Sequence, residues 1–125
     1  MRALIVDDSS AMRAFLKLIL KTAGFVVSEA RNGREALARL ETAGAPELIL
    51  LDWNMPEMDG FAMLRAMRAD ARWRDVKVMM VTTETEMAEM AKALGAGADE
   101  YVMKPFTREV ILEKIEILGL MPQAL

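Results

Sequence analysis

The chain has 125 residues, enough for one domain with a substantial core and too few for two domains of ordinary size. Its 16 basic and 19 acidic residues give a net charge of −3, which weighs against nucleic acid and anionic membranes as partners, because both usually require a basic surface. There is no cysteine for disulfide or thiolate chemistry and no histidine to act as a base, metal ligand or phosphoryl carrier. The amino-terminal segment lacks the features of a signal peptide, and no apolar run is long enough to span a membrane, so we expect a cytoplasmic protein.

Strand-like and helix-like patterns alternate five times along the chain. Short apolar runs without helical periodicity predict strands, and apolar residues at i, i+3, i+4 and i+7 predict amphipathic helices. The expected strands cover residues 3–6, 25–27, 47–52, 76–81 and 101–103. The expected helices alternate with them and cover about 12–23, 34–43, 60–67, 84–94 and 108–118. Such repeats predict a parallel sheet with helices on both faces.

The composition of the strands predicts their order in the sheet. Residues 3–6, 47–52 and 76–81 are almost continuously apolar, as expected for central strands that are covered on both faces. The second and fifth strands adjoin polar residues and therefore resemble edge strands. The sequence thus predicts a single doubly wound, flavodoxin-like α/β domain spanning residues 1–125, with strand order 2-1-3-4-5.

Charged and hydroxyl side chains follow the carboxyl ends of four strands: Asp7 and Asp8 the first, Asp52 the third, Thr82 the fourth and Lys104 the fifth. Ligands of doubly wound sheets bind beyond these ends at the switch in strand order, here between the first and third strands. Three neighbouring carboxylates repel one another, and a hard divalent cation such as Mg²⁺ relieves the repulsion through oxygen ligands. Three aspartates and one lysine carry a net −2, which one Mg²⁺ neutralises.

The same set of residues suits phosphoryl chemistry. Lys104 and the metal would hold phosphoryl oxygens, and the Thr82 hydroxyl would donate a hydrogen bond. Asp52 lies at the centre of the set and is the natural nucleophile, since aspartyl phosphate is a known covalent form. A cis bond between Lys104 and Pro105 would turn the chain so that the lysine faces the site. Each residue alone has a simpler explanation: Asp7–Asp8 or Thr82 as a helix cap, Asp52 as a solvated strand end, and Lys104–Pro105 as a plain turn. Their combination at one sheet edge is what indicates a functional site.

The segments that carry these residues resemble a known family. "LIVDDSSAMR", "LILLDWNMPEMDGF", "VMMVTTE" and "GADEYVMKPF" are similar, in order and along essentially the whole chain, to the receiver domain of two-component response regulators. The set is highly specific, although no single segment is. The "DWNMP" stretch is most similar to single-domain chemotaxis regulators. Within it the sequence gives Trp53 no role beyond covering or reporting the site.

The resemblance implies a phosphorylation-activated switch of a two-component, chemotaxis-like system, and not a turnover enzyme. Asp52 would accept the phosphoryl group from a histidine kinase. The family's Mg²⁺ would be held by carboxylate oxygens of Asp8 and Asp52 and by the main-chain carbonyl of Asn54, with Asp7 acting through water.

The resemblance also implies roles in binding and switching. Thr82 and Lys104 would bind the phosphoryl group, and Tyr101 corresponds to the aromatic switch residue of the fifth strand. Asn54 and Glu84 occupy the two variable positions that tune self-dephosphorylation in the family.

An output surface is expected on the fourth helix, fifth strand and fifth helix. Several positions there are more apolar than the core requires, although scattered apolar surface residues are an equally good explanation. The output partner would be the flagellar motor switch or a different protein, and the chain would be a monomer or a phosphorylation-dependent dimer. The expected surface comprises Met87, Met90, Tyr101, Val110, Lys114 and Ile117.

Three alternatives stay open at this point. A Mg²⁺-dependent phosphatase with an aspartyl-phosphate intermediate would use the same acids, but it usually needs a cap over its substrate. A flavin-binding domain would need a phosphate-cradling loop after the first strand, where this chain has the acidic "DDSS". A receiver cut from a longer, non-chemotaxis regulator with a DNA-binding output would have this same sequence.

Overall fold

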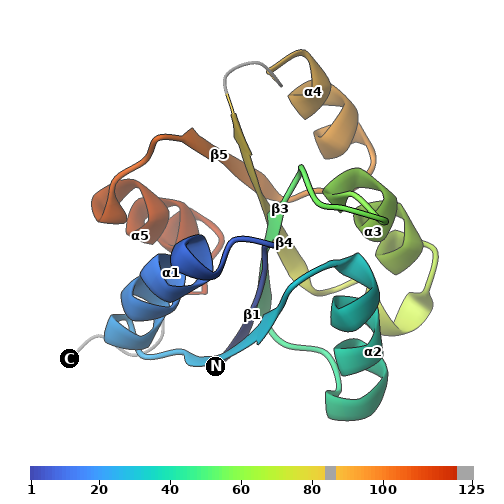
Figure 1. The fold of residues 1–125 in the computed structure, drawn as a ribbon, viewed down its shortest axis with the longest axis horizontal. Coiled ribbons are helices and arrows are strands. Elements are labelled where there is room, and N and C mark those ends of the chain that lie inside the picture. Colours follow the sequence, from blue (N-terminus) through green and yellow to red (C-terminus); the bar gives the residue numbers. More distant parts are fainter. Residues whose placement is uncertain (84–86, 121–125) are drawn as a thin grey trace.

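Strands and helices alternate along the chain in the computed structural model, which describes residues 1–83 and 87–120 (Figure 1). The described elements are β1 (Arg2–Val6), α1 (Ser10–Thr22), β2 (Val26–Ala30), α2 (Gly33–Ala43), β3 (Leu48–Asp52), α3 (Gly60–Arg68), the short 3₁₀ helix η1 (Ala71–Trp73), β4 (Lys77–Thr83), α4 (Met87–Gly95), β5 (Glu100–Lys104) and α5 (Arg108–Ile117). In this part of the chain no helix has the length and apolarity needed to cross a membrane.

The five strands form one parallel sheet in the order β2-β1-β3-β4-β5, which confirms the predicted topology. β3 is buried along its whole length, and β1 and β4 are buried over most of theirs. β2 and β5 lie at the edges, and each has only one buried residue. The switch in strand order therefore falls between β1 and β3, as expected.

The helices cover the sheet in two layers (Figure 1). One face packs against α1 and α5 through a core that includes Leu16, Leu20 and Ile111. The other face packs against α2, α3 and α4 through a core that includes Leu40 and Leu64. Both faces of the central strands are therefore removed from water, which explains their continuous apolar sequence.

Side-chain caps begin the helices close to the carboxyl ends of the strands. The side-chain oxygens of Ser9, Asn32, Asp59 and Thr107 each accept a hydrogen bond from the main-chain N–H three residues later. Such caps satisfy N–H groups that have no partner inside the helix. They fix the points at which the chain leaves the sheet, and so they position the loops that carry the acidic residues.

The structure differs from the predicted elements mainly at their boundaries. The second strand covers Val26–Ala30 and not 25–27, because the N–H of Phe25 donates to the carbonyl of Leu20 in α1 and pairing with β1 begins at Val26. The fourth strand extends to Thr83, and η1 was not predicted. The fourth helix was expected from Glu84, which lies outside the described residues.

Candidate functional site at the carboxyl ends of the strands

Asp52 is held at the end of a buried strand by main-chain contacts. The residues before it, from Leu48 to Leu51, are at most 1% exposed, and the side chain of Asp52 itself is 6% exposed. The N–H of Trp53 donates to the carbonyl of Val81 over 3.1 Å, and the N–H of Gly60 donates to the carbonyl of Trp53 over 2.9 Å. A Cβ at Gly60 would overlap the main-chain oxygen of Asp52. Only glycine therefore lets the start of α3 come this close to the acid.

Asp7 follows β1 and is almost fully buried, with 2% exposure. Its Oδ1 accepts a hydrogen bond of 2.8 Å from the N–H of Ser9, and its main-chain oxygen accepts one of 2.7 Å from the guanidinium of Arg13. Its Oδ2 is buried and has no hydrogen-bond partner among the described residues. A buried carboxylate oxygen without a partner is costly, which suggests that it serves a bound group.

The carboxylates of Asp7, Asp8 and Asp52 converge, as the sequence predicts. Each offers one oxygen, and these oxygens all lie within 4.8 Å of one another. Asp8 is exposed, so the cluster is open to solvent on one side. Asn54 lies two residues after Asp52 and is exposed. A set of hard oxygen donors with one orphaned member fits a hard divalent cation.

Lys104 and Thr82 approach the acids from β5 and β4. Lys104 Nζ lies 3.2 Å from Asp52 Oδ1, and the Lys104–Pro105 bond is cis, as expected. Asp52 is in register with Val81, so Thr82 is the next residue along the neighbouring strand. Thr82 is 1% exposed, and its hydroxyl donates to the main-chain oxygen of Thr83 over a long 3.4 Å.

Burial and mutual repulsion alter the acidity of the cluster. Burial, followed by the charge of Asp7, raises the pKa of Asp52 from 3.8 to about 6, against the opposing effect of Lys104. Burial also raises the pKa of Asp7, although the N–H of Ser9 and the charge of Lys104 oppose this. Lys104 alone therefore does not offset the cost of ionising these acids. A further cation at this position would do so.

Trp53 is a core residue and not a cover over the site. It is 7% exposed and belongs to the core on the α2–α4 face. Its ring stacks on that of Phe61 with centroids 5.6 Å apart, and Lys92 Nζ lies 4.8 Å from the centroid of the Phe61 ring. The residue next to Asp52 is thus connected through α3 to α4. No spacing in the sequence indicated this contact, because it joins three separate elements.

An open hollow of about 610 Å³ lies between β5 and α5, where part of the output surface was expected. Tyr101, Lys104, Val110 and Lys114 line it. Tyr101 is half-buried, and Lys114 Nζ lies 5.1 Å from its ring centroid and 3.2 Å from Glu100 Oε1. The lysine of the acidic site and the expected switch residue therefore line the same hollow.

The other expected surface positions are less uniform. Ile117 is 65% exposed, whereas Val110 is half-buried and packs against the core beneath α5. Met90 is only 8% exposed, so its expected place on the surface is wrong; α4 turns this methionine inward. The side chain of Met87, like the whole of Glu84, lies outside the described part of the chain.

A doubly wound sheet with an acidic cluster, a lysine and a threonine at its switch point defines a class of protein, the phosphoacceptor domains of signalling pathways. The model of the response regulator receiver domain matches residues 3–116, and the chain belongs to this family.

Several proteins that the chain resembles are chemotaxis proteins. It is 45% identical to chemotaxis protein CheY of Pseudomonas aeruginosa, covering 93% of this chain and 94% of the relative. It is 41% identical to chemotaxis protein CheY1 of Helicobacter pylori, covering 94% and 96%. The crystal structure of CheY4 of Vibrio cholerae superimposes with a TM-score of 0.86 at 34% identity, covering 94% of this chain and 97% of that one.

Membership in the receiver-domain family establishes the general function of the chain. The chain is a receiver domain homologous to chemotaxis response regulators and is a phosphorylation-activated switch of two-component type. Its family implies a histidine kinase as phosphodonor and an output partner. Such domains generally act as signalling switches and not as turnover enzymes.

Proposed function

We propose that Asp52 is the phosphoacceptor of a chemotaxis-like pathway and that residues 1–125 form a single cytoplasmic receiver domain without turnover activity of its own. The observation that carries this proposal is the position of Asp52. It is a buried carboxylate on a rigid central strand, 3.2 Å from Lys104 and beside the acids Asp7 and Asp8. No other acid of the cluster combines burial with a lysine partner.

The transfer exchanges one bond for another. A carboxylate oxygen of Asp52 attacks the phosphorus of a phosphohistidine on the kinase, forming the O–P bond of the aspartyl phosphate. The N–P bond breaks, and its electron pair stays on the imidazole of the donor, which takes a proton from solvent. Asp52 must be ionised to attack, and a pKa of about 6 leaves it mostly ionised near neutral pH.

Mg²⁺ is the cation that we assign to the cluster. Asp7, Asp8 and Asp52 would hold it together with the main-chain carbonyl of Asn54, and the unpartnered Asp7 Oδ2 supports this assignment. When bound, Mg²⁺ supplies positive charge that neutralises the acids and the incoming phosphoryl oxygens. The acids themselves orient the ion, because their strand ends are fixed by the sheet.

Lys104 and Thr82 would stabilise the phosphorylated form. The ammonium of Lys104 would move from Asp52 to a phosphoryl oxygen, and the hydroxyl of Thr82, whose hydrogen bond is long, would turn to donate to another. Tyr101 adjoins the same edge of the sheet and would respond by turning inward. The hollow between β5 and α5 would then change shape, and this coupling constitutes the switch.

The output partner would bind over β5 and α5 and the neighbouring part of α4. Tyr101, Val110 and Lys114 line the hollow, and exposed Ile117 extends the surface. The flagellar motor switch is our candidate partner, and the chain would act as a monomer or as a phosphorylation-dependent dimer, without nucleic acid or membrane. Asn54 and Glu84 would set the lifetime of the phosphate.

Intact mass after incubation with Mg²⁺ and a small phosphodonor tests this proposal. We expect a gain of one phosphate in the native chain and none in Asp52→Asn, while Glu57→Gln, which alters an exposed acid in the loop after Asp52, keeps the gain. Stable protein phosphate supports the switch. Rapid release of phosphate from small esters without a phosphorylated protein would instead favour the phosphatase alternative.

A further inference from the structure

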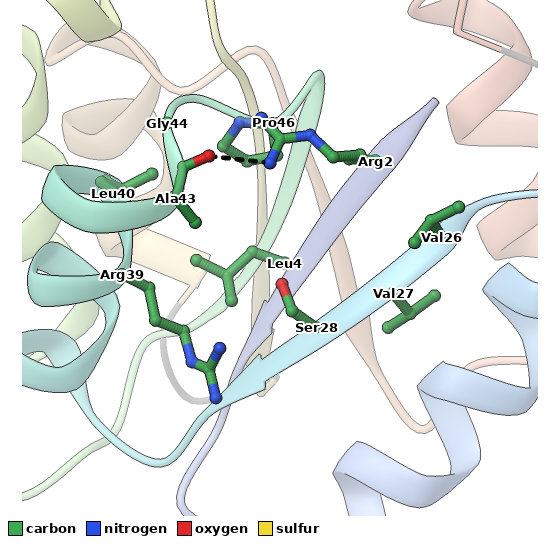
Figure 2. A pocket seen from close by; sticks show the side chains of 10 residues that line it. All are labelled: Arg2, Leu4, Val26, Val27, Ser28, Arg39, Leu40, Ala43, Gly44 and Pro46. Atoms are coloured by element: carbon green, nitrogen blue, oxygen red, sulfur yellow. Dashed lines mark hydrogen bonds between the residues drawn. The ribbon is translucent and has the colours of Figure 1, made fainter.

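A second hollow, of about 210 Å³, lies at the amino ends of β1 and β2, at the edge of the sheet opposite the acidic cluster (Figure 2). It exists because α2 leaves the first half of β2 uncovered. Val26 is 68% exposed and Ser28 is exposed, although both share a sheet face with the buried Ala30. The uncovered strip of sheet and the carboxyl-terminal half of α2 form its two walls.

The inside of the hollow is largely apolar. Leu4 and Leu40 form its base and are almost fully buried, and Pro46 contributes to one side. The complete lining is Arg2, Leu4, Val26, Val27, Ser28, Arg39, Leu40, Ala43, Gly44 and Pro46. This lining has two basic residues and no acidic one.

The two arginines lie on opposite sides of Leu4 (Figure 2). The guanidinium of Arg2 is fixed at the rim, because it donates to the main-chain oxygens of Ala43 and Ala45 over 3.0 and 2.7 Å. Arg39 is exposed, and its guanidinium makes no hydrogen bond or ion pair with any described residue, although its charge acts on Glu35 one turn earlier in α2. A guanidinium has five N–H donors, of which Arg2 uses two, so both arginines can still bind an anion.

We propose that this hollow binds a small organic carboxylate with a compact apolar body. A cavity of about 150 Å³ is enough for a benzene ring, so this hollow accommodates one ring or a short branched chain. The carboxylate would bind Arg39, whose planar guanidinium matches it in a two-pronged geometry, and Arg2 would add its charge. The site is separate from the acidic cluster and does not depend on the phosphoryl chemistry proposed above.

Phenylbutyrate is a suitable probe, and phenylbutanol is its uncharged counterpart with the same apolar body. In a titration of the isotopically labelled, metal-free chain by NMR, we expect saturable shifts of the amides of residues 26–28 and 39–44. The amides beside Asp7 and Asp52 should not shift. Because a charged hydrogen bond is lost, phenylbutanol should bind roughly tenfold more weakly.

Two variants test whether Arg39 binds the carboxylate or whether the hollow binds only the apolar part of the probe. Arg39→Gln should weaken phenylbutyrate binding roughly tenfold and leave phenylbutanol binding unchanged. Arg34→Gln removes an exposed arginine of the same helix that does not line the hollow, and it should change neither. Equal binding of the acid and the alcohol, an unaffected Arg39→Gln, or no shift at millimolar probe would each overturn the proposal.

Discussion

The two ends of the sheet differ in how far their charged side chains are satisfied by hydrogen bonds. At the amino ends of β4 and β5, the guanidinium of Arg68 donates five hydrogen bonds, to the main-chain oxygens of Gly97, Trp73, Arg74 and Val76 and to the carboxylate of Asp99. At the carboxyl ends, Asp7 keeps a buried oxygen without a described partner, and the pKa of Asp52 is raised.

The contrast separates a structural charge from a functional one. All five donors of Arg68 are used, so this residue ties α3 to η1 and to the start of β4 without any ligand. The acids at the other end are left incompletely satisfied, and burial makes them costly as ions. Charged groups that bind a cation and a phosphoryl group are left without protein partners, whereas the donors of a structural charge are all paired within the fold.

Removal of Arg68 should have the largest effect on stability. Arg68→Ala leaves the half-buried main-chain oxygens around it without this donor, and the carboxylate of Asp99 keeps only the N–H of Val78, so the free energy of unfolding should fall by about 4 kcal/mol. Arg65→Ala, which removes an exposed arginine one turn earlier in α3, is the control and should cost less than about 1 kcal/mol. Urea unfolding followed by circular dichroism measures both. A similar loss in the two variants would contradict the structural role of Arg68.

Asp52→Asn should stabilise the metal-free fold. The pKa of Asp52 is raised from 3.8 to about 6, so between these values the folded chain holds a proton that the unfolded chain releases. Stability contributed by this group therefore falls as pH rises through that window. The variant should be more stable than the native chain by up to about 3 kcal/mol at neutral pH, and the difference should vanish below about pH 4. A difference that does not change with pH would contradict the raised pKa.

Gly60→Ala should displace the main chain at Asp52 through a steric clash, without changing any charge. The added Cβ would overlap the main-chain oxygen of Asp52, so we expect a loss of about 2 kcal/mol and a weaker phosphorylation yield. Gly95→Ala in α4 is the matched control, since its Cβ would meet nothing within 4 Å, and it should keep or slightly raise stability. Thermal unfolding and intact mass measure the two effects. Equal tolerance of both substitutions would show that α3 does not constrain Asp52.

Lys92→Met should have the smallest effect, because it removes only the charge over the Phe61 ring. We expect a loss of about 0.5 kcal/mol. In the background of Phe61→Leu the same substitution should be neutral, and a double-mutant cycle by urea unfolding measures this coupling. Lys21→Met on α1 is the control for the charge change. Additive losses in the cycle would exclude a direct contact between α3 and α4 at this point.

The sequence was most informative about strand order and about which residues meet at one edge of the sheet, because the apolar pattern alone determines both. Continuous apolar runs identified β1, β3 and β4 as central strands, and strand order then brought Asp7, Asp8, Asp52 and Lys104 to one edge. This inference needs no side-chain detail, because the carboxyl ends of parallel strands lie together.

The sequence was least informative where contacts join distant elements. Met90 was expected on the surface and is buried, since helical periodicity over a short helix does not fix which side meets the sheet. The stacking of Trp53 on Phe61 and the hydrogen bonds of Arg68 depend on the packing of whole elements. The hollow beside Arg39 likewise depends on how far α2 extends over β2.

The central claim is that the acids at the carboxyl ends of the strands need one more cation to neutralise them. Thermal unfolding with and without Mg²⁺ tests this claim most directly. At millimolar Mg²⁺ the native chain should unfold at a higher temperature, because the ion binds the folded state alone. Asp7→Asn, which neutralises the acid with the unpartnered oxygen, should lose most of this increase. Asp70→Asn, which neutralises a half-buried acid outside the cluster that is paired with Arg72, should keep it. An equal increase in all three proteins, or no increase in the native chain, would contradict the account.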